Sequence, residues 1–197
     1  MICDICKKRV FGVTWQSDAD GTVALCRECG QELQSTLDRV DVQLSRIGTM
    51  DNLLAEILAV AKKITRSDMG NIQLVDRDGV LRITVHDGFA DEFLAFFSEV
   101  KESEAACGTA LKTRQTIVVE DVERSPLFVG TPALKIMLNA GARAVQSTPI
   151  FSRSGELIGI FSTHYRQPRQ IDTHTVRLLG FLAAQAGRYI ERLTVAS

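Results

Sequence analysis

Four cysteines lie within the first 30 residues and form two CxxC pairs, Cys3 with Cys6 and Cys26 with Cys29. Two residues between paired cysteines form a tight knuckle that lets both thiolates reach one ion, and two knuckles complete a tetrahedron. Zn²⁺ suits a tetrahedral thiolate site and needs no redox chemistry. Because protein would fill all four coordination positions, the spacing predicts a structural zinc ion and leaves no open position for a substrate.

Two other uses of these thiols compete with zinc. An iron–sulfur cluster also takes four thiolates, and spacing alone does not separate it from a zinc site. A redox-responsive sensor would oxidise the cysteines. However, a thioredoxin-type motif has a single CxxC near a βαβ unit, and stable disulfides belong to oxidising compartments. The spacing therefore favours structural zinc, with the redox-responsive sensor as an alternative.

The start of the chain and its apolar runs indicate the compartment. The sequence MICDIC lacks the basic-then-apolar signature of a signal peptide, and no run approaches the ~18 apolar residues that a membrane span needs. We therefore expect a cytoplasmic protein with no membrane partner, in which the thiols stay reduced.

The residues between the two cysteine pairs predict the element that brings the pairs together. VFGVTW (10–15) and TVALC (22–26) have the composition of short strands, and QSDADG (16–21) is a turn-rich connection that ends in Asp-Gly. CRECGQEL then runs directly into a helical pattern. The second knuckle is thus expected at a helix N-terminus, where backbone N–H groups stabilise thiolates. Residues 1–30 resemble a treble-clef or zinc-ribbon module with a small β-hairpin.

The charge of this zinc module bears on its partner. Four basic side chains in residues 1–30 are balanced by four acidic ones, and the formal net charge of the whole chain is -1. A phosphate-binding face needs a surplus of Lys and Arg, and only Lys7, Lys8 and Arg9 form a small basic patch. We therefore expect the module to dock a signalling protein or to stabilise the chain. The alternative is a transcription-associated regulator whose zinc module contacts nucleic acid.

Residues 31–48 predict a connecting helix. Its apolar positions alternate in steps of four and three, which is the spacing of a heptad seam. These positions are Leu33, Leu37, Val40, Leu44 and Ile47. A seam of about two heptads is too short to stand alone, so we expect support from neighbouring elements and a homodimer through the flanking helices. The alternative is that the helix packs on its own domain.

The remaining residues, 49–197, predict one α+β body. The apolar content of 45% and the charged content of 24% are those of a globular protein. GNIQLVD and GVLRITVHDG flank the turn RDG as a hairpin, and DEFLAFFSEV is amphipathic at helical spacing. A second hairpin turns at SRSGE, and a long helix follows from about residue 172 to 194.

This order of elements resembles a GAF domain of the kind common in bacterial signalling and sensor proteins. The resemblance covers roughly residues 50–195. It rests on a hairpin, a helix, CGTAL, a strand ending in VVEDV, AGARAVQSTPI, GELIGIFSTHY and a last helix with LLGFLAAQAGRYIER. It implies a six-stranded antiparallel sheet with helices on both faces and a pocket between one sheet face and its covering helices. The flanking helices of such domains commonly form dimers and pass signals to effectors.

The resemblance also implies that several activities known in the family require residues that this sequence lacks. Relatives that reduce free methionine sulfoxide use several cysteines near the pocket, whereas this body has Cys107 alone. Bilin-binding relatives anchor the pigment on a cysteine that is often followed by His, and here Gly108 follows Cys107. The Asn-Lys-Phe-Asp-Glu signature of many cyclic-nucleotide domains is not found. No arrangement resembles a Ser-His-Asp triad, so we expect a non-enzyme without catalytic residues.

A ligand pocket would have inward-facing strand residues as its floor and the aromatic helix as its roof. Strand alternation does not fix the inward set without a register. The expected ligand-binding residues are Phe93, Phe97, Cys107, Thr109, Leu134, Met137, Leu138, Ser147, Phe161 and Thr163. His164, in STHY, is expected in the scaffold or the pocket wall. This composition suits a small organic molecule; the alternative is an ordinary core in a domain that serves as a dimerisation scaffold.

The sequence therefore predicts a non-catalytic signalling or regulatory sensor in three parts. These are a zinc-ribbon-like module over 1–30, a connecting helix over 31–48 and a GAF-like domain over 49–197. The GAF-like domain would bind a small molecule or hold a dimer together, and the structural zinc module would serve docking.

Overall fold

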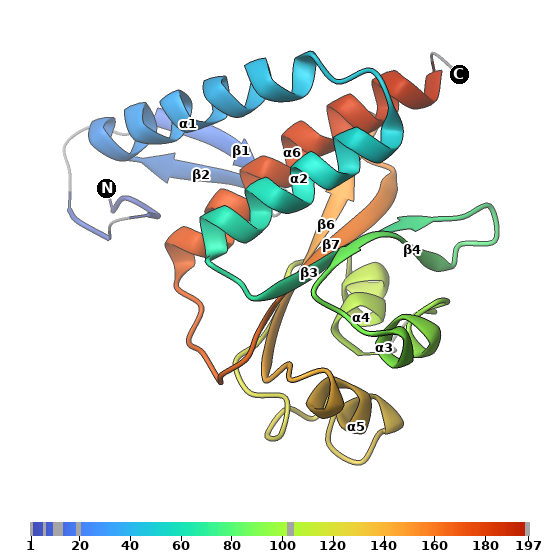
Figure 1. Cartoon of the computed structure of the whole chain (residues 1–197). Coiled ribbons are helices and arrows are strands. Elements are labelled where there is room, and N and C mark those ends of the chain that lie inside the picture. Colours follow the sequence, from blue (N-terminus) through green and yellow to red (C-terminus); the bar gives the residue numbers. More distant parts are fainter. Residues whose placement is uncertain (1, 6, 10–13, 19–20, 102–104, 196–197) are drawn as a thin grey trace.

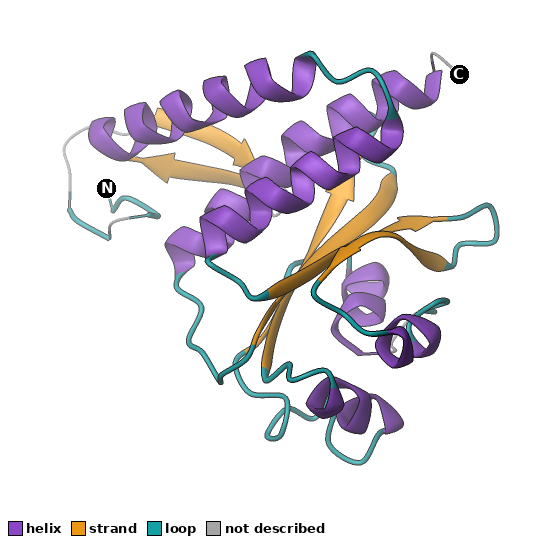
Figure 2. Cartoon of the chain, viewed as in Figure 1, coloured by secondary structure: helices purple, strands orange, loops and turns teal. Residues whose placement is uncertain are grey.

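The computed structural model describes residues 2–5, 7–9, 14–18, 21–101 and 105–195, with the backbone alone for 14–18, 21–23 and 195. These residues form a five-stranded antiparallel sheet with helices on both faces, a connecting helix and a separate two-stranded hairpin (Figures 1 and 2). The strand order in the sheet is β4-β3-β7-β6-β5. The sheet comprises β3 (Met69–Val75), β4 (Leu81–Asp87), β5 (Ile117–Val119), β6 (Ala144–Phe151) and β7 (Leu157–Tyr165).

Two layers of helices cover the sheet. One face carries α2 (Met50–Thr65) and α6 (Thr173–Val195), and the other carries α3 (Asp91–Phe96), α4 (Ala105–Thr113) and α5 (Pro132–Asn139) (Figure 1). Side chains alternate between the layers along each strand. Ile72 and Phe161 enter the core shared with α2 and α6, whereas Val145 and Ile160 enter the core shared with α3, α4 and α5.

The sheet has five strands among the described residues, not the six that the family resemblance implies. At the β4 edge, Val100 and Leu81 exchange two backbone hydrogen bonds of 2.9 Å, but this pairing is an isolated bridge. The chain beyond β4 is used for α3, so only one residue of the segment after α3 extends the ladder. The expected sixth strand is therefore not found in the described part of the chain.

α6 approaches the sheet closely. A Cβ at Gly187 would overlap with the carbonyl oxygen of Phe151, so glycine is required there to let the helix reach the end of β6. Around this point Leu182, Ala183 and Ala186 are buried in the core of α2 and α6. Small side chains thus set the short distance between helix and sheet.

The predicted N-terminal hairpin is present with shifted boundaries. β1 (Thr14–Asp18) pairs antiparallel with β2 (Gly21–Leu25), and Asp18 lies opposite Gly21 at the turn. The predicted first strand over 10–15 begins outside the described residues, and the observed one continues through residues that the composition assigned to the turn. Polar side chains do not prevent pairing in a two-stranded sheet, since backbone groups form the ladder.

The connecting helix α1 (Arg27–Ser45) packs within its own chain. Leu33 and Leu37 enter a small core under the cysteines, and Val40, Leu44 and Ile47 join the core of α2 and α6. The heptad seam is therefore occupied by α2 and α6, as in the alternative interpretation of the sequence. The homodimer through the flanking helices stays a prediction.

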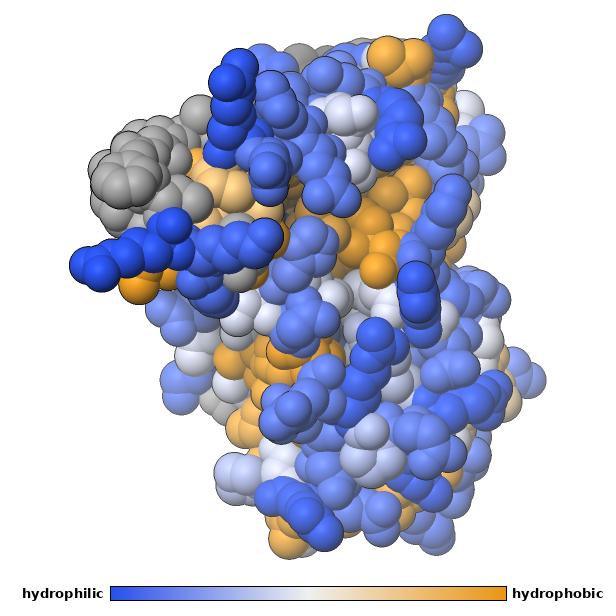
Figure 3. All heavy atoms as spheres, turned by 90° about the vertical axis from the view of Figure 1, so that its left-hand side faces the viewer, coloured by the Kyte–Doolittle hydropathy of each residue, from blue (hydrophilic) through white to orange (hydrophobic). Residues whose placement is uncertain are grey.

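The surface at the N-terminal end is mostly hydrophilic, with apolar areas between the hydrophilic side chains (Figure 3). Among the described residues, the large apolar side chains that are exposed are Ile2, Val42, Phe96, Val118 and Val129. None of the described helices is long and apolar enough to cross a membrane.

Candidate functional site

A small cavity lies between the sheet and the layer of α3, α4 and α5. Its volume is about 20 Å³, which is room for about one water molecule. The floor consists of strand residues, namely Asn71, Gln73, Val145, Ser147, Ser162 and His164. The roof consists of Phe97, Ala105, Ala106, Cys107, Phe128 and Met137. A polar floor under an apolar roof is thus buried in the middle of the domain.

The floor carries buried polar atoms that have no hydrogen-bond partner among the described residues. They are Oδ1 of Asn71, Nε2 of Gln73 and both ring nitrogens of His164. Only the hydroxyls of Ser147 and Ser162 bond each other, at 2.8 Å. A buried polar atom without a partner costs about 1–3 kcal/mol. Each such atom needs a hydrogen-bond partner, which a buried water or a polar group of a ligand supplies.

His164 is held as a neutral imidazole. Its side chain is buried, and the rings of Phe89 and Phe93 stand edge-on to it with centroids at 4.9 and 5.7 Å. Burial lowers the pKa of His164 to about 3, because the apolar surroundings disfavour the charged form. At neutral pH the ring therefore offers one donor and one acceptor.

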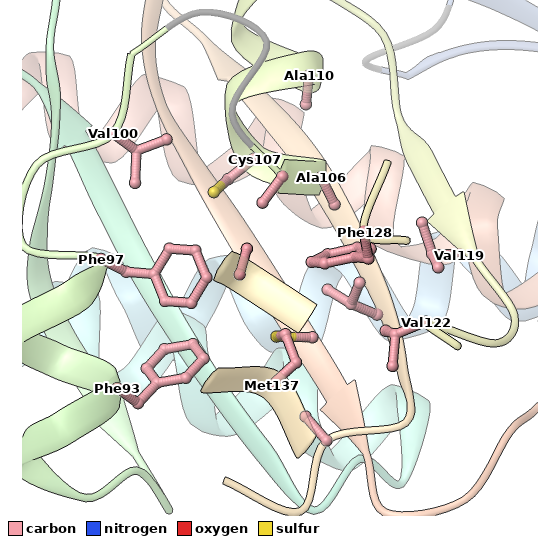
Figure 4. Packing of buried hydrophobic residues seen from close by; sticks show 14 of the residues in the cluster. Phe93, Phe97, Val100, Ala106, Cys107, Ala110, Val119, Val122, Phe128 and Met137 are labelled. Atoms are coloured by element: carbon pink, nitrogen blue, oxygen red, sulfur yellow. The ribbon is translucent and has the colours of Figure 1, made fainter. Parts of the chain in front are cut away.

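Aromatic rings close the cavity on the α3 side. Phe93 stacks on Phe89 at 3.8 Å between ring centroids and contacts Phe97 at 4.6 Å. Figure 4 shows Phe93 and Phe97 together on one side, Phe128 on the other, and Cys107 and Met137 between them. No charged side chain of the described residues lines the cavity. The site therefore favours an uncharged ligand with polar and apolar faces.

A groove of about 500 Å³ reaches the roof from outside. Phe97 and Ala105 line both this groove and the cavity. The groove is mainly apolar, and Phe96 at its edge is 41% exposed. The phenyl ring of Phe97 therefore stands between the cavity and the surface.

The structure brings four of the ten predicted ligand-binding residues to the cavity, namely Phe97, Cys107, Met137 and Ser147. His164 also lies in the wall, as expected. Phe93, Leu134 and Leu138 pack in the surrounding core, and Thr109 donates its hydroxyl to the carbonyl oxygen of Ala105 at 2.7 Å. Ligand binding by these residues stays a prediction.

Phe161 and Thr163 lie on the opposite face of the sheet from the cavity. Phe161 is fully buried in the core of α2 and α6, and Thr163 is two residues further along the same strand. Their neighbours Ser162 and His164 line the cavity instead. Side chains alternate between the two faces along a strand. Choosing the wrong set of alternate residues therefore places every predicted pocket residue of that strand on the opposite face.

Asn71, Gln73, Ser162 and Phe128 were not among the predicted site residues. The first two carried a signal: in GNIQLV, polar side chains alternate with apolar ones in a strand that is buried on both faces. Buried polar residues at alternate positions indicate a polar surface inside the domain. Phe128 lies in the segment between β5 and α5, where periodicity gives no such signal.

Three cysteines form a second candidate site, the cysteine clip of Cys3, Cys26 and Cys29. Their Sγ atoms all lie within 4.8 Å of one another. Cys26 is the N-cap of α1, and its Sγ accepts a hydrogen bond of 3.5 Å from the backbone N–H of Cys29. The second knuckle thus begins a helix, as predicted. Cys6, the fourth predicted ligand, lies outside the described residues.

Backbone and side-chain contacts of Asp4 hold the segment that carries Cys3 beside the hairpin. Asp4 donates its N–H to the carbonyl oxygen of Ala24 at 2.8 Å, and its carboxylate accepts the N–H of Ala24 at 2.7 Å. Lys7 adopts a left-handed conformation with φ of 58°, and its N–H bonds to the carbonyl oxygen of Cys3 at 3.0 Å. This tight turn brings Cys3 against Cys26 and Cys29, although the two segments are far apart in sequence.

These observations define a class of protein: an α+β domain with an antiparallel sheet, helices on both faces and a cavity enclosed over one face. The chain belongs to the GAF domain family, whose model, described as "GAF domain", matches residues 48–191. The match contains the whole sheet, α2 and most of α6.

Known proteins similar to this chain include a sensor, a domain of a phosphotransferase and a reductase. The methyl sulfide methyltransferase-associated sensor of Methanosarcina acetivorans is 22% identical over 174 residues, which are 84% of this chain but 17% of that protein. The GAF domain of a phosphoenolpyruvate-protein phosphotransferase from Coxiella burnetii has a TM-score of 0.70 at 14% identity, covering 84% of this chain and 96% of that one. Free methionine-R-sulfoxide reductase from Neisseria meningitidis, solved with its substrate, has a TM-score of 0.67 at 19% identity and covers 95% and 100%. The two structures support the fold.

Proposed function

We propose that this chain is a non-catalytic sensor module whose GAF domain binds a small uncharged molecule over the β3–β7–β6 floor. Because the cavity as it stands has room for about one water molecule, the ligand would bind with the roof residue Phe97 displaced toward the neighbouring groove. The observation that carries the proposal is the group of unpartnered buried atoms on Asn71, Gln73 and His164 around one cavity. A ligand with both donors and acceptors would satisfy these atoms and recover part of their desolvation cost. The similarity to a sensor of Methanosarcina acetivorans agrees with such a role.

Enzymatic activity is not part of the proposal. The cavity offers one thiol, that of Cys107, and a neutral histidine that contacts two stacked phenyl rings. No second cysteine of the described residues lines it, and thiol redox chemistry of the reductase type needs a resolving thiol. A binding role uses all the polar atoms of the floor, whereas a catalytic role leaves most of them unexplained.

Native mass spectrometry after exposure of the protein to a metabolite extract tests the sensor proposal. We expect a retained small molecule on the wild-type protein and at least about a tenfold lower occupancy on Gln73→Met, which removes a floor amide at similar volume. The control is Gln167→Met, because Gln167 is exposed and is not among the residues that line the cavity. No retained molecule, or equal occupancy in both variants, would contradict the proposal in favour of a dimerisation scaffold, whose dimer mass the same spectrum reports.

We further propose that the cysteine clip, together with Cys6, holds a structural Zn²⁺. Four thiolates at about 2.3 Å from a tetrahedral zinc lie about 3.8 Å apart, and the three described Sγ atoms lie within 4.8 Å of one another. Under this proposal the clip joins the N-terminal knuckle to the start of α1 and forms a docking surface at the end of the connecting helix. A small module of this kind folds largely through its metal.

Metal analysis with thiol counting tests the zinc proposal. We expect one zinc per chain, and its loss in Cys29→Ser, with the GAF domain remaining folded because its core lies elsewhere. Cys107→Ser is the matched control and should keep the metal. Iron in place of zinc, or oxidised thiols without metal, would overturn the proposal.

A further inference from the structure

A second concave surface lies on the other side of the sheet from the cavity, where α1 and α6 run side by side (Figure 1). This α1–α6 groove has a volume of about 630 Å³, within the range of small-molecule sites. Three side chains of α6 donate hydrogen bonds to α1 and to the residues that directly follow it. Gln185 donates to the carbonyl oxygen of Leu37 at 3.0 Å, Tyr189 to that of Asp41 at 3.1 Å, and Arg192 to that of Ile47 at 3.1 Å.

The groove has one acidic and one basic wall. Asp38 and Asp41 line it from α1, and Arg153 and Arg188 line it from the β6–β7 turn and α6. Among the described residues no ion pair joins the two walls; Arg153 instead contacts Glu191 at 3.8 Å, outside the acidic wall. Oδ1 of Asp41 accepts a hydrogen bond of 2.7 Å from the hydroxyl of Tyr189, and Oδ1 of Asp38 accepts one of 2.7 Å from Nε2 of Gln34. Because both donors are neutral groups, the two carboxylates keep their charge opposite the basic wall.

A buried acceptor lies between the walls. Gln185 is 5% exposed, and its Oε1 has no hydrogen-bond partner among the described residues, although its Nε2 is bonded to α1. Gln185 also lines the groove. An amide oxygen at this position requires a donor, and an ammonium group supplies one.

We propose that the α1–α6 groove binds a small zwitterion of the amino-acid class. Its ammonium group would lie toward Asp38 and Asp41 and donate a hydrogen bond to Oε1 of Gln185. Its carboxylate would pair with the guanidinium groups of Arg188 and Arg153, which match carboxylate geometry. A simple anion would leave the charge of the acidic wall uncompensated and the amide oxygen without a donor, and a simple cation would leave the charge of the basic wall uncompensated. The site is separate from the cavity, so it does not depend on the proposed sensor ligand.

Three probes of equal chain length test this inference in NMR titrations of the whole protein at low ionic strength. They are 6-aminohexanoate, hexanoate, which lacks the ammonium, and hexylamine, which lacks the carboxylate. We expect 6-aminohexanoate to bind about tenfold more tightly than either of the others, because its ammonium group pairs with the acidic wall and its carboxylate with the basic wall. Trimethylation of its nitrogen should weaken binding, because the cation then has no N–H for Gln185.

Substitutions at two exposed residues test which wall binds which charged group of the probe. Arg188→Gln should weaken 6-aminohexanoate about fivefold or more and leave hexylamine unchanged, whereas Asp38→Asn should weaken 6-aminohexanoate and leave hexanoate unchanged. Arg124→Gln is the control for net charge, because the side chain of Arg124 is 88% exposed and outside the groove. Equal binding of all three probes, no binding, or an equal effect of Arg124→Gln would overturn the inference. A concentration-dependent dimer that Arg188→Gln dissociates would also overturn it, since the groove would then be an interface between two copies.

Discussion

The two faces of the central sheet use the same strands differently. On β7, Phe161 is buried against α2 and α6, while the next residue, Ser162, and His164 line the cavity. On β3, Ile72 faces the helices and Gln73 faces the cavity. Neighbouring residues thus enter an apolar core on one side and a polar site on the other.

This difference shows where the domain gives up stability. The face under α2 and α6 is mainly apolar, with close helix approach at Gly187. The unpartnered polar atoms among the described residues of this face include Oε1 of Gln146 and Oγ1 of Thr163, which belong to residues paired across β6 and β7. On the cavity face the unpartnered atoms surround a cavity. Polar groups buried without partners lower stability, and such unfavourable groups are expected at functional sites.

The largest effect should come from the apolar face. Phe161→Ala removes a fully buried ring from the core of α2 and α6, and we expect the free energy of unfolding to fall by about 3–5 kcal/mol. Urea unfolding followed by circular dichroism measures this loss. Phe96→Ala, at a ring that is 41% exposed, should cost about 1 kcal/mol or less. Similar losses in both variants would contradict the assignment of the apolar face as the main source of stability.

A smaller effect should come from the cavity face and depend on pH. The pKa of His164 is about 3 in the folded chain, against the ordinary value of 6.5. Between these two values the unfolded chain binds a proton that the folded chain does not, so stability is full above about pH 6.5 and falls with decreasing pH. The expected loss is about 1.4 kcal/mol per pH unit, or about 2 kcal/mol at pH 5.

Denaturant unfolding at pH 7.5 and at pH 5.0 measures the effect of His164. His164→Phe should lose about 2 kcal/mol less than the wild type between these two pH values, because the titrating group is gone. His174→Gln is the control, since His174 lies outside the cavity at the start of α6. If the wild type and His164→Phe show the same pH dependence, the neutral buried histidine is ruled out.

The sequence predicted much of this architecture because its local signals and its fold agree. The last helix, expected over 172–194, is observed over Thr173–Val195, and the second knuckle begins a helix at Cys26 as expected. The order of hairpins and helices matched the family resemblance. Short-range periodicity fixes such elements, since each depends on residues close together in the chain.

The sequence did not predict which alternate residues of β7 face the cavity, and the reason is physical. Nearly all residues of Leu157–Tyr165 are buried, because helices cover both faces of this central strand. A strand buried on both sides lacks the polar–apolar alternation that identifies the inner face. From the sequence, Phe161 was expected in the pocket and His164 in the scaffold or the pocket wall. Only the register of the sheet shows that these two residues lie on opposite faces. Spacing alone predicted a site of four cysteines; the structure brings Cys3, Cys26 and Cys29 together, and Cys6 lies outside the described residues.

The smallest expected effect has the opposite sign and most directly tests the comparison of the two faces. Gln73→Met replaces a buried amide, whose Nε2 has no partner among the described residues, with an apolar side chain of similar volume. Because the desolvation cost of that amide disappears, we expect the free energy of unfolding to rise by about 1 kcal/mol. The same variant should lose ligand occupancy in native mass spectrometry, so stability and binding would move in opposite directions. A destabilised Gln73→Met that still binds the ligand would show that the amide serves packing, and the cavity face would then resemble the apolar face in purpose.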